Sequence, residues 1–354
     1  MAKGLNKIFY WMLLFVPVTL YFSYFTHNDI ITFITAIIAI IPLAAVIGFV
    51  TKDIVLRSNP TWGGLLNATF GNAIELIIAI LALRQGLVEI VQASIIGSIL
   101  GNLLLLTGLS IFFGGIKYKE QRFNKMSVGV SSTMLIIAVA GLAIPTFYSL
   151  TMPTNPHQIM ILSDALAVVL ALIYMAGLFF ALFTHKHLFD ASDEIKSSSE
   201  RAVLSRKKAG WILFATVLVV ALVSQGLVNT AEHAAVSMGL TQTFIGIFII
   251  AIIANIAEKG AAIHFARDNK LDISIEIGLS SAIQIALFVV PILIFISSIF
   301  HYGFSLVFTA FEVITMLFAV MIINYLSADG RCNWLEGAQL ITLYLIVAIV
   351  YYFI

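Results

Sequence analysis

Apolar segments long enough to cross a lipid bilayer recur along the whole chain, and no other feature constrains its fold as much. A helix needs roughly 20 mostly apolar residues to span a hydrocarbon core of about 30 Å. Short polar joints separate eleven such segments, at residues 8–26, 30–50, 62–84, 88–115, 127–148, 158–184, 210–229, 242–266, 273–300, 303–326 and 335–354. The sequence therefore predicts an all-α integral membrane protein with eleven transmembrane helices.

The composition excludes an ordinary soluble domain. The chain is 61% hydrophobic and 10% charged, with a mean hydropathy of +1.05, whereas soluble domains carry about 25% charged residues. Lys3 and Lys7 precede the first apolar segment, which contains no small-residue cleavage site, so we interpret it as a retained span. Cys332 stands alone, which excludes an intramolecular disulfide and a CxxC metal site.

The joints between the expected spans predict the orientation, because cytoplasmic loops are rich in Lys and Arg. One side carries 17 such residues and the other side only Arg84. We therefore expect a multi-pass protein of the cell membrane with a cytoplasmic N-terminus and an extracytoplasmic C-terminus. The 17 residues are Lys3, Lys7, Lys52, Arg57, Lys117, Lys119, Arg122, Lys125, Lys186, Lys196, Arg201, Arg206, Lys207, Lys208, Arg267, Lys270 and Arg331.

One joint, residues 185–209, is long, polar, mixed in charge and rich in Ser. We interpret it as a solvated cytoplasmic linker. The alternative is a short regulatory amphipathic helix with Asp190, Asp193 and Glu194 on one face. The expected organisation is an N-terminal transmembrane helix (1–29), a first five-helix repeat (30–184), the linker (185–209) and a second five-helix repeat (210–354).

An internal repeat relates the third and eighth expected spans at a constant offset of 183 residues. Residues 71–75 (GNAIE) align with residues 254–258 (ANIAE), so that Asn pairs with Asn and Glu with Glu. The same offset places Ser98 on Ser281. The two spans enter the membrane from opposite sides, and such inverted repeats are typical of secondary transporters, which bind substrate near the bilayer midplane.

Glu75 and Glu258 are the strongest candidates for the functional site. Each lies about ten residues inside an apolar span, where an ionised carboxylate is costly unless it faces a polar cavity. Asn72 and Asn255 precede them by three residues on the same helical face and add amide oxygens. An oxygen-only ligand set suits Ca²⁺ better than Na⁺ or Mn²⁺. The alternative is that each glutamate is a protonated structural hydrogen bonder.

Neighbouring spans contain further polar residues that we expect to support this site. These are Ser98, Asn102, Ser281 and Gln284, for which an ordinary interhelical hydrogen bond is the alternative. Gly71 permits close helix approach or local unwinding, with plain packing as the alternative. Glu312 lies well inside the tenth expected span, as a supporting carboxylate, a proton-path residue or one member of a structural pair.

A mechanism follows from the two buried carboxyl groups. Burial favours the neutral, protonated form when no metal is bound, so the site accepts either a dication or protons. Because the site holds either the dication or protons but not both, the cation flux and the proton flux are coupled. An inward proton gradient would then drive the cation out as helices rock around a fixed site.

Four segments closely resemble the signature repeats of the calcium/proton exchanger (CAX) family. They are GNAIELI at 71–77, GSILGNLLLLTG at 97–108, NIAE at 255–258 and SSAIQIALFVVP at 280–291. The resemblance covers nearly the whole chain and is closest to bacterial members. It implies Ca²⁺ bound by Glu75 and Glu258, countertransport of protons, and assembly as a homo-oligomer in the lipid bilayer. We expect Ca²⁺ and H⁺ as substrates, no resident cofactor and no nucleic-acid partner.

The chain departs from the family pattern at Ala254, where Gly is usual, and at Lys259, where His usually follows the glutamate. We expect the Lys259 ammonium to snorkel toward the cytoplasmic end of its span. The alternatives are that desolvation neutralises it or that it acts as a tethered counter-ion beside the site.

Other functions are predicted less well by these residues. An exchanger for another cation (Na⁺, K⁺ or Mn²⁺), or one that couples Ca²⁺ to Na⁺, is the closest alternative. A channel would conduct passively, which the inverted repeat with midplane carboxylates does not favour. An enzyme would need a motif such as HExxH or GxSxG, and neither occurs in the sequence.

Overall fold

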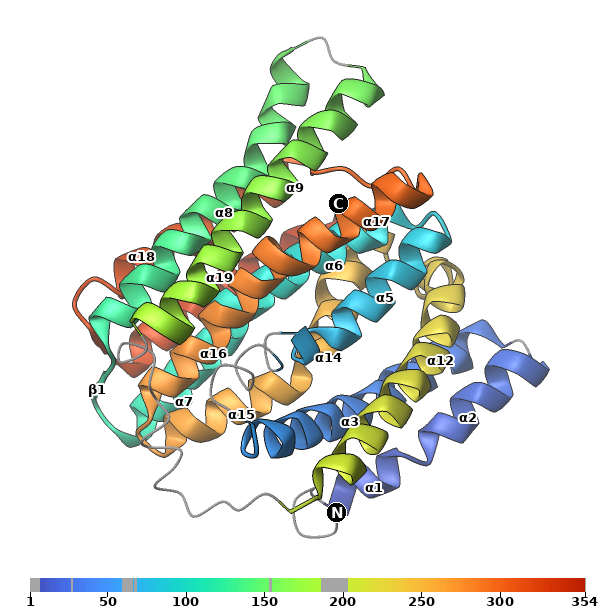
Figure 1. Cartoon of the computed structure of the whole chain (residues 1–354), viewed down its shortest axis with the longest axis horizontal. Helices are drawn as coiled ribbons and strands as arrows, with labels where there is room; N and C mark the ends of the chain where they lie inside the picture. Colours follow the sequence, from blue (N-terminus) through green and yellow to red (C-terminus); the bar gives the residue numbers. More distant parts are fainter. Residues whose placement is uncertain are drawn as a thin grey trace.

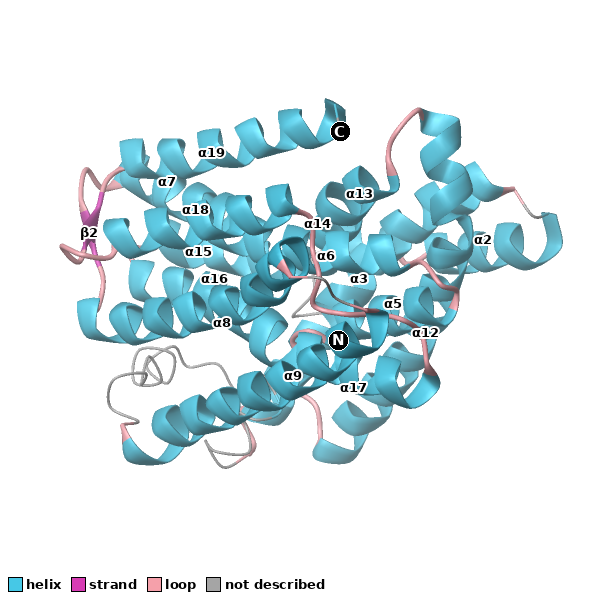
Figure 2. Ribbon diagram, turned by 90° about the horizontal axis from the view of Figure 1, so that it is seen from above, coloured by secondary structure: helices cyan, strands magenta, loops and turns pink. Residues whose placement is uncertain are grey.

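The computed structural model consists almost entirely of helices. It describes residues 7–26, 28–58, 66, 69–152, 155–185 and 203–353. Within these ranges the strands form a single antiparallel pair, β1 (Gln121–Arg122) and β2 (Arg331–Cys332). Figure 2 shows this pair at the edge of an otherwise helical molecule. The expectation of a helical fold is confirmed.

Eight helices in the described part of the chain are long and apolar enough to cross a membrane. They are α1–α2–η1 (Lys7–Met12, Phe15–Tyr21, Phe22–Thr26), α3 (Asp29–Val55), α6–η2–α7 (Val88–Leu100, Gly101–Leu106, Thr107–Lys117), α8 (Lys125–Thr151), α9–η3 (Pro156–Phe179, Phe180–Thr184), α12 (Arg206–Met238), α16–η5–α17 (Leu271–Gln284, Ile285–Val289, Val290–Phe300) and α19 (Trp334–Phe353).

A ninth candidate span is bent by 60° between Ala254 and Ile256. It comprises α13 (Gln242–Phe244), η4 (Ile245–Ile250), α14 (Ala251–Ala254) and α15 (Ile256–Arg267). The other two expected spans correspond to shorter helices, α5 (Ala73–Arg84) and α18 (Ala310–Leu326). Residues 59–65 and 67–68, which belong to the expected span 62–84, lie outside the described residues. Eight or nine of the eleven expected spans are therefore confirmed.

The helix expected from residue 303 begins only at Ala310, so that prediction is wrong for residues 303–309. A buried non-helical backbone is tolerated at membrane depth only where protein groups satisfy it. Gln92 donates to the carbonyl of Val307 (2.7 Å). Hydroxyls of α17, α9 and α8 accept three backbone N–H groups: Phe304 donates to Ser297 (2.8 Å), Leu306 to Ser163 (3.0 Å) and Phe308 to Thr146 (2.9 Å).

The internal repeat is visible in the helix boundaries. α5 and α15 are each 12 residues long, and both their first and their last residues differ by the offset of 183. The same offset relates α7 to α17, and α6 begins at the position equivalent to the start of α16. Even the π-helical turns η2 and η5 follow equivalent helices, α6 and α16.

The two repeat helices α5 and α15 point toward opposite ends of the molecule. The α6–η2–α7 helix is 30 residues long, about 45 Å at 1.5 Å per residue. α5 leads through a short turn into the start of this helix, where Thr243 donates to Glu89 (2.6 Å). α15 ends beside the far end of the same helix, where Lys117 donates to the Arg267 carbonyl (2.8 Å).

Joints rich in Lys and Arg gather at that second end. The β1–β2 pair aligns Arg122 with Arg331, and Gln121 donates to the Ala266 carbonyl (2.9 Å). Three joints that the sequence assigns to one side of the membrane therefore meet at one end of the molecule.

The helices form two flanks around a central group (Figure 1). α3 and α12 pack along each other on one flank, with α1 and α2 outside them. α8, α9 and α18 lie on the opposite flank, while α5, α6, α14 and α15 lie between the flanks. Most of α6–η2–α7 is buried, whereas almost none of the N-terminal span is fully buried.

The expected linker is described only at its end, since residues 186–202, including Asp190, Asp193 and Glu194, lie outside the described part. α12 begins at Arg206 rather than at residue 210, because the Ser205 hydroxyl caps it. The buried Asp53 carboxylate accepts the N–H groups of residues 203–204 at 2.6 and 3.0 Å. This contact ties the end of the linker to the end of α3.

Thr146→Val tests whether the Thr146 hydroxyl stabilises the non-helical residues 303–309. The substitution keeps the side-chain shape but leaves the buried Phe308 N–H without an acceptor, which should cost about 1–3 kcal/mol of stability. We expect a clearly lower midpoint of thermal unfolding in detergent. Thr342→Val is the matched control, because the Thr342 hydroxyl is exposed and donates only within its own helix. Equal melting temperatures for both variants would contradict this role.

Candidate functional site

Two broken helices place the candidate glutamates in the middle of the molecule. Asn72 and Asn255 stand immediately before α5 and α15 and share nearly the same backbone conformation, φ −102°, ψ 21° and φ −97°, ψ 11°. Glu75 and Glu258 therefore lie in the first turns of their helices. Unpaired N–H groups make a helix N-terminus favourable for negative charge.

Hydrogen bonds from both repeats join the asparagines to residues of α6, η2 and α16. Asn72 donates to the Gln284 carbonyl oxygen (2.5 Å), and Asn255 donates to Ser98 (3.1 Å). Asn102 donates to the Ser281 hydroxyl (2.8 Å). The Ser281 hydroxyl also lies in hydrogen-bonding contact with Glu258. The structure therefore joins four of the predicted residues, Ser98, Asn102, Asn255 and Ser281, in one polar network, and it pairs two more, Asn72 and Gln284, beside that network.

Five buried acceptor oxygens of the site have no hydrogen-bond partner among the described residues. They are Oδ1 of Asn72, both carboxylate oxygens of Glu75, Oδ1 of Asn102 and Oε2 of Glu258. Glu75 and Glu258 are near enough to repel each other electrostatically. Buried polar atoms without partners are costly, and an ionised carboxylate only accepts. Protons or a metal cation would supply the missing partners, and oxygen ligands of this kind fit Ca²⁺.

Lys259 is placed differently from our expectation. Its side chain is only 6% exposed, and its ammonium is buried without a hydrogen-bond partner in the described part of the chain. The snorkelling prediction is therefore wrong. The ammonium lies beside Gly101, whose absent Cβ would be 3.8 Å away, and it interacts electrostatically with Glu258 and Glu75. The lysine turns inward because its helix starts at the central break rather than at the end of a continuous span.

A cavity of about 510 Å³ leads to the site from one end. Its lining includes Glu258 and Gly71 together with Thr51 and Lys52, which lie near the end of α3. Gly260 and Ala261 of α15 also border it. Since α15 runs toward the end that carries the Lys and Arg joints, the cavity extends toward that end.

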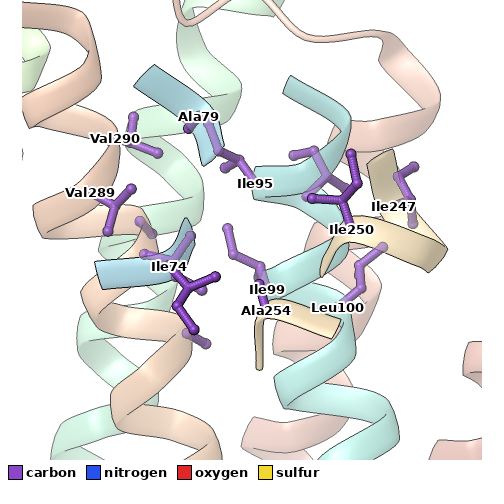
Figure 3. Close-up of a cluster of buried hydrophobic side chains, with 14 of the residues drawn as sticks. Ile74, Ala79, Ile95, Ile99, Leu100, Ile247, Ile250, Ala254, Val289 and Val290 are labelled. Atoms are coloured by element: carbon purple, nitrogen blue, oxygen red, sulfur yellow. The ribbon is translucent and has the colours of Figure 1, made fainter. Parts of the chain in front are cut away.

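Apolar side chains pack together beside Glu75 (Figure 3). We name this group the apolar cluster: Ile74, Ala79, Ile95, Ile99, Leu100, Ile247, Ile250, Ala254, Val289 and Val290. The space left beside Glu75 and Ser98 measures only about 10 Å³. That is barely enough for one water molecule. A hydrated ion does not fit into that space in this conformation.

Glu312 is not linked to the network by any hydrogen bond of its carboxylate among the described residues. Its carboxylate accepts from the Thr309 N–H (2.8 Å) and hydroxyl (3.0 Å). This capping box begins α18. These contacts fit a structural role for Glu312 better than a role as a supporting carboxylate beside the ion.

Glu276, which is not among the residues that the sequence predicts for the site, lines a second cavity of about 440 Å³ between α8, α9 and α16. Ser127 donates to its carboxylate (3.3 Å). Ser280 and Gln284 line the same cavity. The signal was present in the spacing, because residues 276, 280 and 284 fall on one face of a helix.

Comparison with known proteins gives consistent matches over nearly the whole chain. The sodium/calcium exchanger protein family matches residues 28–183 and again residues 208–353. The Ca²⁺/H⁺ antiporter ChaA of Bacillus subtilis is 40% identical, covering 98% of this chain and 99% of its own. A Ca²⁺/H⁺ antiporter of Aphanothece halophytica is 38% identical, with 98% and 97% covered.

A solved structure described as native YfkE superposes with a TM-score of 0.85 at 38% identity, covering 98% of this chain and 100% of that chain. The chain is therefore similar to this protein in fold as well as in sequence. The chain therefore belongs to the sodium/calcium exchanger protein family, and its resemblance to the calcium/proton exchangers within it is confirmed.

Proposed function

We propose that this protein is a secondary antiporter that moves Ca²⁺ out of the cytoplasm in exchange for external protons. The observation that carries the proposal is the set of five buried, unpartnered acceptor oxygens on Asn72, Glu75, Asn102 and Glu258. The names of the Bacillus subtilis and Aphanothece halophytica relatives support the same substrates. Ca²⁺ is cargo here rather than a resident cofactor.

Coupling arises because the same oxygens serve both substrates. Ca²⁺ requires ionised carboxylates as ligands, whereas proton binding removes their charge. When neither is bound, mutual repulsion and burial destabilise two ionised carboxylates in the protein interior. The empty, fully ionised site is thus the least favourable state. Each change between the two access states therefore takes place with either Ca²⁺ or protons bound.

Alternating access supplies the transport step. In this conformation the cavity along α3 reaches Glu258, whereas only about 10 Å³ of space is left among the apolar side chains beside Glu75. We assign the complementary state to opening of the apolar cluster together with closure of that cavity. The near-equivalent geometry of α5 and α15 supports two such states around a fixed site.

The proposal also includes the number of spans, the two repeats and the orientation in the membrane. We assign eleven spans, with α5 and α18 as the two short ones, in the organisation 1–29, 30–184, 185–209 and 210–354. The opposite directions of α5 and α15 support inversion of the two five-helix repeats. The end that carries the Lys and Arg joints is assigned to the cytoplasm, so the cavity along α3 faces the cytoplasm and the C-terminus does not.

Exchange of Na⁺, K⁺ or Mn²⁺, or Na⁺-coupled movement of Ca²⁺, is the alternative, and the buried Lys259 ammonium favours a cargo with lower charge. Proteoliposomes with separately imposed pH and Na⁺ gradients distinguish these cases. Ca²⁺ movement that follows the Na⁺ gradient and ignores the pH gradient would reject proton coupling.

Glu75→Gln and Glu258→Gln test the proposed ion ligands. Each amide keeps the shape of the side chain but loses the charge that binds Ca²⁺ and the group that takes up a proton. In ⁴⁵Ca uptake by everted vesicles, we expect both variants to lose exchange completely. Glu232→Gln is the control, since Glu232 is exposed and contacts Gln242 away from the site. Substantial proton-driven Ca²⁺ uptake by either variant would contradict the assignment of that glutamate as an ion ligand.

The orientation can be tested with single cysteines. In a Cys332→Ser background, Glu120→Cys labels the end with the Lys and Arg joints, and Gln85→Cys labels the other end. A membrane-impermeant maleimide applied to intact cells should react at position 85 and not at position 120. Everted vesicles should give the reverse pattern, and the opposite result in both preparations would invert the proposed topology.

A further inference from the structure

Lys259 brings a positive charge into the centre of the proposed cation site. The side chain leaves α15 one residue after Glu258, in the turn that follows the break at Asn255. Its ammonium is buried and lacks a hydrogen-bond partner in the described part of the chain. It interacts with both Glu258 and Glu75, and with Glu258 more strongly. A buried charge without close partners is costly, so its retention points to a role in the site.

The internal repeat allows the surroundings of Lys259 to be compared with the equivalent place in the other half. At the offset of 183, Gln284 corresponds to Gly101, and Lys259 corresponds to Leu76. In one half, the Gln284 side chain fills the space beside the first asparagine and accepts its amide (2.5 Å). In the other half, Gly101 has no side chain, and the Lys259 ammonium occupies the adjacent space. The site is therefore asymmetric, with a glutamine on one side and a cation on the other.

We propose that Lys259 is a tethered cation that partly neutralises Glu75 and Glu258 in the empty site and thereby sets the cation selectivity of the exchanger. This inference rests on the proposed function. It makes Lys259 a specificity-determining residue, which binds no cargo and acts through the charge it places next to the carboxylates.

Charge balance gives the direction of the effect. Two carboxylates and one ammonium leave a net charge of −1, which one monovalent cation cancels. A divalent cation leaves the site at +1 and lies near a like charge that solvent does not screen. Lys259 therefore weakens the binding of Ca²⁺ much more than the binding of Na⁺. Without the ammonium, the two carboxylates match a divalent cation.

Lys259→Met tests this charge directly, because methionine is unbranched, similar in length and well suited to a buried apolar position. Lys259→Gln is a second neutral variant, and Lys259→Arg retains the charge. Lys207→Met, at an exposed position on α12, is the control for loss of a lysine elsewhere. The readouts are the Kd for Ca²⁺ by calorimetry and the Kd for Na⁺ by competition, on purified protein at one fixed pH, with melting curves to confirm folding.

We expect the neutral variants to bind Ca²⁺ about tenfold or more tightly than wild type, with a much smaller change for Na⁺. Lys207→Met should bind Ca²⁺ as wild type does, and Lys259→Arg, which keeps the positive charge, should not bind Ca²⁺ more tightly than wild type does. Folded neutral variants whose Ca²⁺ affinity equals or falls below that of wild type would overturn the role of Lys259 while leaving Ca²⁺ as cargo. Absence of Ca²⁺ binding in wild type and in every variant would instead overturn the proposed function, and this inference with it.

Discussion

Buried oxygen atoms with no donors to satisfy them are the constraint on which the rest of this structure depends. Carboxylates and amides in the middle of a membrane protein destabilise it unless protons, a cation or other polar groups complete them. Here the Ser98 hydroxyl of α6 and the Ser281 hydroxyl and Gln284 amide oxygen of α16 accept from the asparagine N–H groups, and other acceptor oxygens stay open. The site is thus organised to hold something positive.

The fold supplies this arrangement by breaking helices where the repeats meet. Asn72 and Asn255 interrupt the regular backbone at equivalent positions, so each glutamate stands at a helix start. Residues 303–309 are also non-helical, and there hydroxyls from three helices accept the N–H groups of Phe304, Leu306 and Phe308. Irregular backbone inside the molecule is therefore tolerated only beside polar side chains, and these cluster in few places.

Much of this organisation could be predicted from the sequence. The offset of 183 identified the paired Asn and Glu residues, because equivalent positions in two copies meet at one axis. Three of the joints rich in Lys and Arg do gather at one end. Hydropathy could not show that residues 303–309 are non-helical, since a short apolar run can be as apolar outside a helix as within one. Nor could it show that Glu312 caps α18 or that Lys259 points inward, because both depend on where a helix begins.

Competition between Ca²⁺ and protons for the same oxygens is the central claim, and proton release on Ca²⁺ binding tests it most directly. Purified wild-type protein in weakly buffered solution receives Ca²⁺ while the pH is recorded and bound Ca²⁺ is measured in parallel. The account predicts that protons are released as Ca²⁺ binds, and that the double variant Glu75→Gln, Glu258→Gln neither binds Ca²⁺ nor releases protons. Saturable Ca²⁺ binding without any proton release between pH values that span the working range would contradict it.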